Sequence, residues 1–183
     1  MKRDELQSID EILQGKVEKV QHRKEWRHFL AECIVTVVSV YVIFQYVIGI
    51  AFVSGSSMEP TLKDRELVVF YRLDETYQRD DLVILRMPGD VEYIKRIVAE
   101  PGETVEFSED GKLLVNGREQ MPEEAMGVTA ALSEDIAYPY TVPEGSYFVL
   151  GDNRENSRDS RSFGAVKQGQ IAGRVFLHMG MTR

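Results

Sequence analysis

The chain is 183 residues long, 43% hydrophobic, and carries a formal net charge of -8 at pH 7. This length suits one medium-sized domain with a small additional element. Lysine and arginine balance aspartate and glutamate within residues 1–50, so the whole net charge belongs to residues 51–183. An acidic domain excludes nucleic acid as a partner, because nucleic-acid binding needs a basic stripe. The single cysteine, Cys33, excludes a disulfide framework and a cysteine-based zinc site.

Residues 1–28 are predicted to form a cytoplasmic tail, in which apolar residues recur every three or four positions among charges. This spacing is typical of an amphipathic helix on the inner surface of a membrane. A solvated helix with no specific role fits the same pattern, and the sequence leaves both interpretations open. The apolar positions are Leu6, Ile9, Leu13, Val17 and Val20.

Residues 29–53 are predicted to form a membrane anchor, because residues 33–53 contain no charged side chain. At about 1.5 Å per residue this run makes a helix of roughly 31 Å, close to the roughly 30 Å hydrocarbon core of a bilayer. A buried core helix is usually shorter and polar along one face. A cleaved signal peptide has an apolar region of only about 7–15 residues near the N-terminus. We therefore expect a transmembrane helix that is retained.

The charges beside this run predict its orientation. An excess of positive residues at one end of a membrane helix favours the cytoplasmic side, and Trp26 and His28 occupy the place of an interfacial belt. The N-terminus is therefore expected inside the cell, with residues 54–183 on the outer face. The positive residues are Lys16, Lys19, Arg23, Lys24 and Arg27.

Residues 54–183 alternate short apolar runs with turns rich in proline and glycine, which is typical of a mainly β, antiparallel domain. Asp110-Gly111 between two such runs predicts a β-hairpin. Residues 118–140 show no clear period, and we expect a small β-rich peripheral insertion over about residues 104–140. The apolar runs are LVVFYRL (67–73), DLVILRM (81–87), YIKRIVAE (93–100), TVEF (104–107), KLLVNG (112–117), SYFVLG (146–151) and GRVFLHM (173–179).

Histidine is scarce in this outer domain. His22 and His28 lie on the predicted inner side, which leaves His178 alone outside. A Ser-His-Asp triad would therefore depend on His178, whose place at the end of a strand-like run favours a structural role. A site with two histidine ligands cannot be built there, and the carboxylates lack the spacing of a metal-binding loop. Neither a metal nor a cofactor is expected.

Lysine is the remaining candidate for a general base. Lys95 lies within the strand pattern of residues 93–98, where alternation puts it on one face with Tyr93 and Ile97. Loss of hydration among apolar neighbours lowers the pKa of a lysine, and only the neutral amine accepts a proton from serine. A lysine that protects an edge strand from aggregation is an equally supported alternative. The other outer lysines lie in polar, turn-like surroundings: Lys63, Lys112 and Lys167.

The candidate nucleophile is Ser57, in the segment SGSSMEPTL (54–62) directly after the anchor. Gly55 and Pro60 favour an irregular, constrained turn around this serine. As a pattern alone, serine and glycine after a membrane helix are more typical of a plain linker. A third polar segment, GDNRENSRDSR (151–161), follows a strand and fits either a solvated loop or a hydrogen-bonded scaffold.

Taken in order, these segments resemble bacterial type I signal peptidases, the Ser-Lys peptidases that remove signal peptides from exported proteins. The resemblance covers nearly the whole chain: the anchor, SGSSMEPTL, RELVVF (65–70), YIKRIVAEPGE (93–103) and GDNRENSRDSR. It implies an antiparallel β-sheet catalytic domain with a smaller β-rich insertion, anchored once in a bacterial cell membrane.

The resemblance also implies roles for individual residues. Ser57 matches the nucleophile, Lys95 matches the general base, and Ser157 matches a hydroxyl that orients the lysine amine. The remaining matches are two pairs of ionic supports, Asp152 with Arg96 and Asp159 with Arg161, and the substrate-pocket residues Met58, Leu62, Tyr93 and Ile94.

Two positions depart from the family. Some members have a serine two positions before the nucleophile, which donates its hydroxyl to the oxyanion, and this chain has Gly55 there. The oxyanion hole is therefore expected to rely on backbone N–H groups, chiefly that of Ser57, with Gly55 acting through its backbone. The second departure is Glu66, which stands where the family often has a Gly-Asp turn.

By this resemblance the chain is expected to cleave preproteins after small-x-small sites through an acyl-enzyme. The expected partners are signal peptides, the lipid bilayer and the translocation machinery. One alternative is a self-cleaving Ser-Lys repressor-type protease, but residues 1–27 are too short for its DNA-binding helix-turn-helix. The other alternative is a non-catalytic membrane module that binds signal peptides, against which the intact set of site residues argues.

Overall fold

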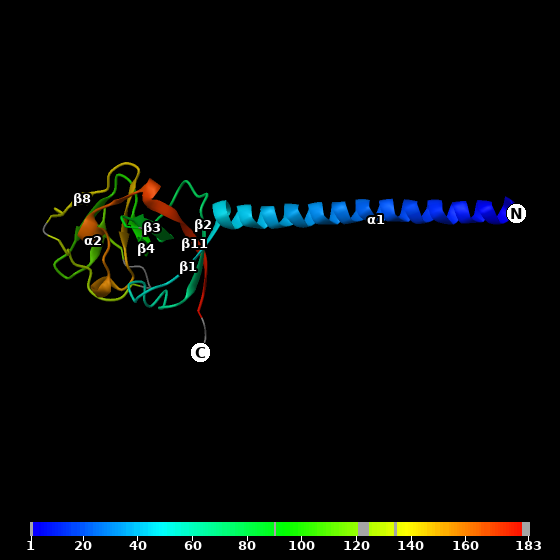
Figure 1. Cartoon of the computed structure of the whole chain (residues 1–183). Coiled ribbons are helices and arrows are strands. Elements are labelled where there is room, and N and C mark those ends of the chain that lie inside the picture. The colour runs from blue at the N-terminus through cyan, green and yellow to red at the C-terminus, as the bar shows by residue number, and fades with distance from the viewer. Residues whose placement is uncertain (1, 90, 121–124, 134, 181–183) are drawn as a thin grey trace. The chain divides into compact units, whose positions relative to one another are not determined.

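The computed structural model describes residues 2–89, 91–120, 125–133 and 135–180, with the backbone alone described for residues 2–20. The chain divides into two compact units, Met1–Gln45 and Tyr46–Arg183. The first is helical and the second is built from two antiparallel sheets (Figure 1).

The helical unit is one long helix, α1 (Lys2–Val42), which continues into a π-helical turn, η1 (Ile43–Val47). Among the described residues a single helix is long and apolar enough to cross a membrane: Gln21–Val47, with a mean hydropathy of 1.9. Its apolar side chains are exposed, as expected of a helix that faces lipid. The amphipathic face predicted over residues 1–28 falls largely outside the described side chains.

The predicted anchor is wrong at its C-terminal boundary. The apolar run continues to Val53, but the helix ends at Val47 and the next residues form the strand β1 (Ile48–Phe52). Gly49 explains part of the change, because glycine is a poor helix former and suits a close approach of another side chain. A Cβ at Gly49 would lie 2.1 Å from Cζ of Phe70 on the neighbouring strand.

The main sheet has seven strands in the order β1-β2-β11-β3-β4-β9-β10, and every neighbouring pair is antiparallel. This confirms the predicted mainly β, antiparallel fold. The C-terminal strand β11 lies between β2 and β3, so the last strand of the domain pairs with two of its first strands. The strands after β1 are β2 (Leu67–Tyr71), β3 (Leu82–Met87), β4 (Val91–Ala99), β9 (Ser146–Leu150), β10 (Val166–Lys167) and β11 (Ile171–Met179).

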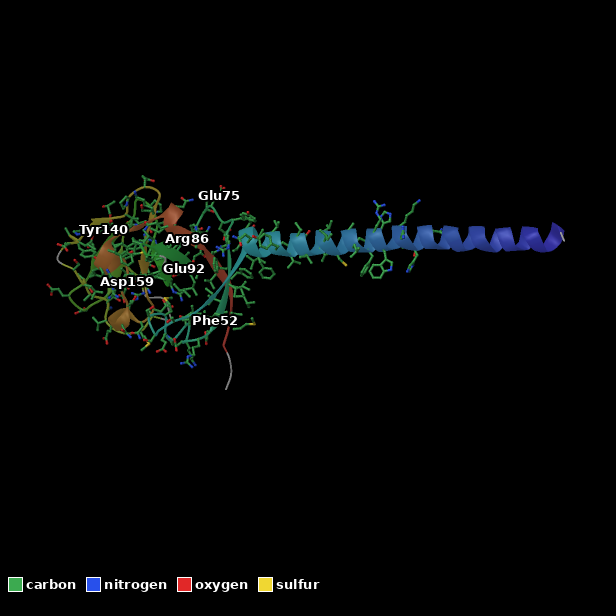
Figure 2. All side chains as sticks on the ribbon, in the orientation of Figure 1. Phe52, Glu75, Arg86, Glu92, Tyr140 and Asp159 are labelled. Atoms are coloured by element: carbon green, nitrogen blue, oxygen red, sulfur yellow. The ribbon has the colours of Figure 1, made fainter. Side chains whose placement is uncertain are left out.

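A smaller sheet, in the order β7-β6-β5-β8, begins at Thr104 and ends at Thr141, one residue beyond the range expected for the insertion. Its β5–β6 pair is the hairpin predicted at Asp110-Gly111. Figure 2 shows Tyr140, on this sheet, on the side of the domain away from Phe52 of β1. The strands are β5 (Thr104–Phe107), β6 (Leu113–Val115), β7 (Arg118–Glu119) and β8 (Tyr140–Thr141).

Among the described residues, two strand edges of the main sheet are unpaired beside Ser57, the predicted nucleophile. β1 is the terminal strand of the sheet, so its outer edge has no neighbouring strand in the part of the chain that the structure describes. β4 pairs with β3 from Val91 to Arg96 but with β9 only from Arg96 to Ala99. The first half of β4 is therefore open on one side, and such edges accept an extended peptide.

Candidate active site

Ser57 lies in the turn that follows β1, and its position is fixed by the residue after it. Met58 is 1% exposed and belongs to a buried apolar cluster with Leu62, Val68 and Phe70. The Ser57 carbonyl oxygen also accepts a hydrogen bond of 3.1 Å from the N–H of Asn153. The buried Met58 side chain on one side and the backbone hydrogen bond from Asn153 on the other hold the Ser57 hydroxyl in place.

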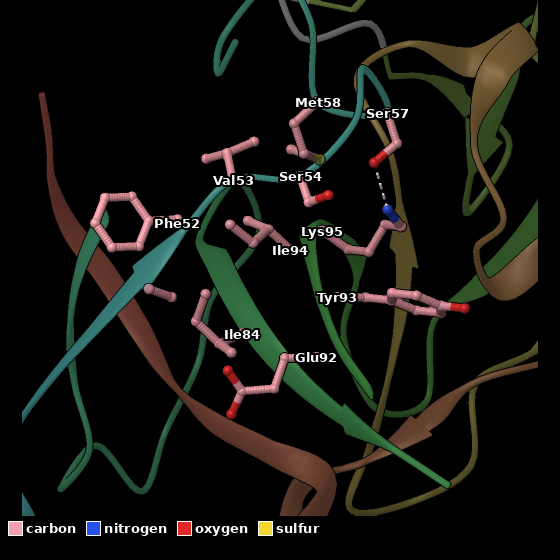
Figure 3. Close-up of a pocket in the computed structure, with 11 residues that line it drawn as sticks. Phe52, Val53, Ser54, Ser57, Met58, Ile84, Glu92, Tyr93, Ile94 and Lys95 are labelled. Carbon is pink, nitrogen blue, oxygen red and sulfur yellow. Dashed lines mark hydrogen bonds between the residues drawn. The ribbon is translucent and has the colours of Figure 1, made fainter. Parts of the chain in front are cut away.

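Lys95 reaches this hydroxyl from β4. Its Nζ donates a hydrogen bond of 2.8 Å to Ser57 Oγ (Figure 3). The lysine is 3% exposed, its Nζ lies 5.5 Å from the centre of the Tyr93 ring, and its cross-strand neighbour Val83 is fully buried. The two side chains therefore meet where a nucleophile and its base need to be.

Burial lowers the pKa of Lys95 from 10.5 to about 8, because a charged amine loses its hydration there. The carboxylates of Asp159 and Asp152 act in the opposite direction, and the Arg161 guanidinium lowers the pKa further. A pKa of about 8 leaves an appreciable share of the amine neutral near pH 7.5, as a general base requires.

An open groove with a volume of about 90 Å³ extends from the Ser57–Lys95 pair between the end of β1 and the open part of β4 (Figure 3). Met58, Tyr93 and Ile94 line it, and their predicted contact with a substrate stays a prediction. Leu62 is fully buried in the cluster around Met58 and is not among the lining residues. The lining residues that sequence reasoning missed are Ala51, Phe52, Val53, Ser54, Ile84 and Glu92.

The predicted support of Arg96 by Asp152 is a bidentate ion pair below the groove. Arg96 Nε donates to Asp152 Oδ1 at 2.8 Å and Arg96 Nη2 donates to Oδ2 at 2.7 Å. Sequence reasoning missed Thr61, whose hydroxyl donates to Asp152 Oδ2 at 2.5 Å. This contact links the segment after Ser57 to the polar loop 151–161, and three side-chain donors hold the Asp152 carboxylate in place.

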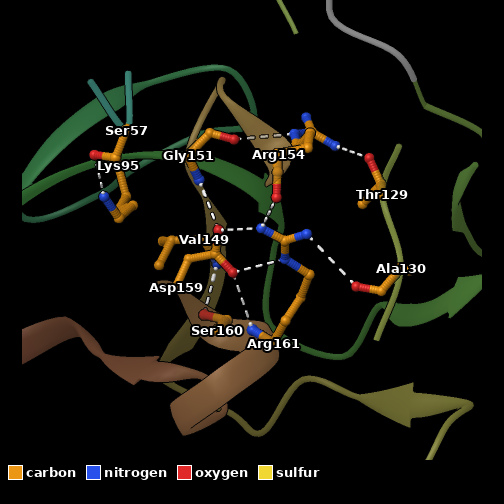
Figure 4. Close-up of polar contacts among 10 residues, drawn as sticks. All are labelled: Ser57, Lys95, Thr129, Ala130, Val149, Gly151, Arg154, Asp159, Ser160 and Arg161. Atoms are coloured by element: carbon orange, nitrogen blue, oxygen red, sulfur yellow. Dashed lines mark hydrogen bonds and ion pairs between the residues drawn. The ribbon is translucent and has the colours of Figure 1, made fainter. Parts of the chain in front are cut away.

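Asp159 and Arg161 form the second predicted pair, which is fully buried (Figure 4). Asp159 Oδ2 accepts hydrogen bonds from Arg161 Nη2 at 2.9 Å and from the N–H of Gly151 at 3.0 Å. Arg161 Nη2 also donates to the Arg154 carbonyl oxygen at 2.7 Å. The 151–161 segment is therefore a closed hydrogen-bonded scaffold rather than a solvated loop, because its buried carboxylate and guanidinium satisfy each other.

Ser157, predicted to orient the lysine amine, is 9% exposed, and its Oγ has no hydrogen-bond partner among the described residues. The same hydroxyl lies against Gly151, where an added Cβ would come within 2.2 Å of Ser157 Oγ and 2.5 Å of the Ser57 carbonyl oxygen. The contact between Ser157 and Lys95 thus stays a prediction, and Gly151 emerges as the residue that lets the loop approach Ser57.

Of the two residues predicted to form an oxyanion hole, Ser57 and Gly55, the second has its backbone N–H engaged elsewhere. The N–H of Gly55 donates to Asp64 Oδ1 at 2.9 Å, and Gly55 adopts a φ of 87° with open space where a Cβ would stand. Within the described part of the chain, the N–H of Ser57 has no hydrogen-bond acceptor. Ser57 therefore keeps a free donor beside its own hydroxyl, whereas the Gly55 N–H holds the turn.

His178, the one histidine within residues 54–183, takes no part in this arrangement. His178 lies on β11, where its Nδ1 is 3.7 Å from Glu66 Oε2 and its side chain is about half exposed. Its paired strand is β2 rather than β4. A Ser-His-Asp triad is not formed by the described residues.

Comparison with known proteins agrees with this geometry. Residues 26–179 match the family model described as signal peptidase, peptidase S26. A signal peptidase I S of Bacillus subtilis (strain 168) is 37% identical over 86% of this chain and 91% of its own length. A signal peptidase I of Bacillus licheniformis is 37% identical over 76% of this chain and 81% of its own length.

The chain belongs to the peptidase S26 family of signal peptidases. It is therefore a serine endopeptidase, as the sequence predicted. A crystal structure of a signal peptidase I from Enterococcus faecalis V583 is also similar, with 34% identity, 55% of this chain and 97% of that chain covered, and a TM-score of 0.47.

Substitution of Gly151 by alanine tests how closely the loop must approach the nucleophile. The added Cβ collides with the Ser57 carbonyl and with Ser157 Oγ, so the Ser57 backbone must shift. A shift of about 1 Å at a reacting atom lowers the rate by roughly 10²-fold. We expect G151A to lose about that much kcat with little change in KM, and Gly169→Ala, at an exposed site with open space, to retain full rate. Unchanged kcat in G151A contradicts the close approach.

Substitution of Lys95 by methionine should stabilise the protein at pH 7. Each pKa unit corresponds to about 1.4 kcal/mol, so burying the charged amine costs about 3 kcal/mol, and loss of the contact with Ser57 offsets about 1 kcal/mol of the gain. Because the folded pKa lies below the unfolded value, this cost is fully present below pH 8. It fades as the pH rises toward 10.5, where the unfolded lysine also loses its proton.

Chemical denaturation at pH 7 and at pH 10.5 measures this effect, with the exposed Lys63→Met as the matched control. We expect K95M to gain about 2 kcal/mol at pH 7 and to lose that gain at the higher pH. If K95M is less stable at pH 7 than the unsubstituted chain, burial of the charged Lys95 amine does not destabilise the folded protein.

Proposed function

We propose that this chain is a signal peptidase, anchored in a bacterial cell membrane, that removes N-terminal signal peptides from exported preproteins after small-x-small sites. The observation that carries the proposal is the 2.8 Å contact between Lys95 Nζ and Ser57 Oγ at one end of an open groove. A serine hydroxyl beside a buried amine of lowered pKa meets the requirements for a nucleophile and its base.

In the first half of the reaction, the neutral Nζ of Lys95 accepts the proton of the Ser57 hydroxyl while Oγ attacks the carbonyl carbon of the scissile bond. The lysine then gives this proton to the leaving amine, and the C–N bond breaks. An ester between Ser57 Oγ and the last residue of the signal peptide remains. Water that gives its proton to Lys95 hydrolyses the ester in the second half, and the amine returns that proton to Oγ.

The negative charge that develops on the attacked carbonyl oxygen needs a donor. The free N–H of Ser57 is the donor that we assign to it, because the N–H of Gly55 is bound to Asp64. Gly55 contributes the left-handed turn that brings the chain to Ser57. Removal of one such donor slows other hydrolases by about 10²–10³-fold, so the geometry of this turn is part of the catalytic machinery.

The substrate is proposed to bind in extended form between the two unpaired strand edges. β1 and the Val91–Lys95 part of β4 each present backbone groups to the groove, which gives affinity with little dependence on side chains. Met58, Ile84 and Ile94 form an apolar lining in a groove of about 90 Å³. So small a space favours short side chains before the cleaved bond, which is the Ala-x-Ala pattern of signal-peptide ends.

Family membership and the apolar helix Gln21–Val47 indicate a membrane-anchored protein. We propose a cytoplasmic N-terminus, supported by the basic residues that precede the apolar run, and a catalytic domain on the outer face. Signal peptides also carry an apolar helix, so enzyme and substrate meet in the plane of one bilayer at high effective concentration. The translocation machinery, which delivers such preproteins, is a further proposed partner.

Alanine substitution of either member of the dyad tests the proposal. Ser57→Ala removes the nucleophile and Lys95→Ala removes the base, so each should lower preprotein cleavage by more than about 10³-fold. The measurement is the rate at which detergent-solubilised full chain releases the mature product with the correct N-terminus. Lys167→Ala, which changes an exposed lysine, should cleave at the normal rate. Turnover within tenfold of normal in S57A or K95A, with the fold retained by circular dichroism, rules out the dyad.

A further inference from the structure

The lining of the groove at Ser57 changes from apolar to charged along β4. Beside the dyad, Ile94 of β4 lies directly across from Ile84 of β3, and both side chains line the groove. Two residues before Ile94 the lining residue is Glu92, which is exposed. No step of the proposed reaction uses this glutamate. The groove therefore carries a carboxylate on the part of β4 that lies away from Lys95.

Glu92 lies on the same face of the sheet as the apolar lining. Figure 3 shows Glu92 and Ile94 extending to one side of β4 and Tyr93 extending to the other. This alternation is the period of two of a strand. Ile84 is the direct cross-strand partner of Ile94, and Arg86 is the direct partner of Glu92. The face that lines the proposed space for short side chains thus continues into Glu92.

An extended substrate beside the open part of β4 follows the same period, because it also has the geometry of a strand. With the residue before the cleaved bond level with Lys95, the third residue before the bond is level with Tyr93 and the fifth with Val91. Ile94 then lies between the first and third side chains, and Glu92 lies between the third and fifth. The third residue is the small one of a small-x-small site. The fifth is therefore the residue whose side chain can reach the Glu92 carboxylate.

The charges at this place favour a basic side chain in the substrate. A lysine or arginine beside Glu92 forms an ion pair, whereas an aspartate or glutamate is repelled. Arg86 is the neighbouring positive charge and is also exposed, but it does not line the groove. The Lys95 amine extends to the other face and donates its hydrogen bond to Ser57. A bound side chain in the groove therefore meets the carboxylate first.

We propose that Glu92 is a specificity-determining residue, which favours lysine or arginine as the fifth residue before the cleaved bond and disfavours aspartate or glutamate there. The inference rests on the proposed function and deepens it, because it adds a preference for charge to the small-x-small rule. Exposed ion pairs change an equilibrium by no more than about fivefold. The preference for lysine over glutamine is accordingly about two- to fivefold in kcat/KM.

A set of peptides with a single cleavage site tests this preference. The peptides share an Ala-x-Ala sequence before the bond and differ only in the fifth residue before it, which is lysine, glutamine or glutamate. The full chain in detergent receives the three peptides in one mixture, and the rates of product formation give the ratios of kcat/KM. We expect the lysine peptide to be cleaved about two- to fivefold faster than the glutamine peptide, and the glutamate peptide to be cleaved slowest. Equal cleavage of all three overturns the proposal.

Two substitutions locate the preference at Glu92. Glu92→Gln should remove the preference for lysine, and Glu92→Lys should reverse it in favour of the glutamate peptide, because the sign of the charge in the groove is reversed. Glu75→Gln makes the same change at an exposed position that does not line the groove, and should keep the ratio of the unsubstituted chain (Figure 2). Each result is a ratio within one protein, so a general loss of activity in a variant does not alter it. A preference for lysine that persists in both Glu92 variants contradicts the proposal.

A second set of peptides separates Glu92 from the net negative charge of residues 51–183. It carries lysine, glutamine or glutamate as the fourth residue before the bond, whose side chain points to the opposite face from Glu92. We expect a clearly smaller preference for lysine in this set. An equal preference at both positions assigns the effect to the net charge and overturns the proposal.

Ser57→Ala shows whether a failure concerns Glu92 or the proposed function, since it should cleave none of the peptides. If the unsubstituted chain cleaves none of them either, or if Ser57→Ala cleaves them normally, the proposed function and the role of Glu92 fail together. If the unsubstituted chain cleaves them at equal rates and Ser57→Ala does not, the role of Glu92 alone fails.

Discussion

The candidate active site depends on one contact, the 2.8 Å separation of Lys95 Nζ and Ser57 Oγ. A lysine amine in water is almost fully protonated at pH 7 and accepts no proton. Burial on β4 lowers the pKa of Lys95 to about 8, at a cost in stability that the rest of the domain must offset. The apolar clusters on both sides of the sheet supply that stability, and Val83 and Ile97, which surround the lysine on the sheet, are fully buried.

The polar loop 151–161 contributes to the same site by controlling the charges near Lys95. Carboxylates close to Lys95 favour its charged form, and both Asp152 and Asp159 are close enough to do so. Each of them is paired with a buried arginine, which reduces its effect on the amine. The loop also contacts the Ser57 backbone through Asn153, so one scaffold affects both the position of Ser57 and the charge around Lys95.

Much of this architecture follows from local sequence. The turns at proline and glycine divide the strands correctly, and Asp110-Gly111 predicts the hairpin that is found. Lys95 stands out because a lysine within an apolar strand pattern is unusual. The end of the anchor was misjudged because Ile48–Phe52 is as apolar as a membrane helix, and only its pairing with β2 makes it a strand. The length and the hydropathy of this segment do not reveal that it pairs with β2.

The contacts that sequence reasoning missed join residues far apart in the chain. Thr61 meets Asp152, and Arg154 meets Thr129, although neither pair has a recognisable local pattern. The pairing of Ser57 with Lys95 is predicted from three ordered motifs of a known family. The local pattern alone leaves Lys95 with an equally good structural role and favours a plain linker around Ser57.

The measurement that tests this account most directly is the ionisation of Lys95 in the intact enzyme. Carbon-13 labelling of the lysine side chains and an NMR pH titration give the midpoint for each amine, with the Lys95 signal identified by its absence in Lys95→Met. Lys112, whose pKa is raised by its contact with Glu119, serves as the internal reference. The account predicts a midpoint of about 8 for Lys95. A midpoint near 10.5, the ordinary value, would mean that the amine is charged at neutral pH and is not the base of Ser57.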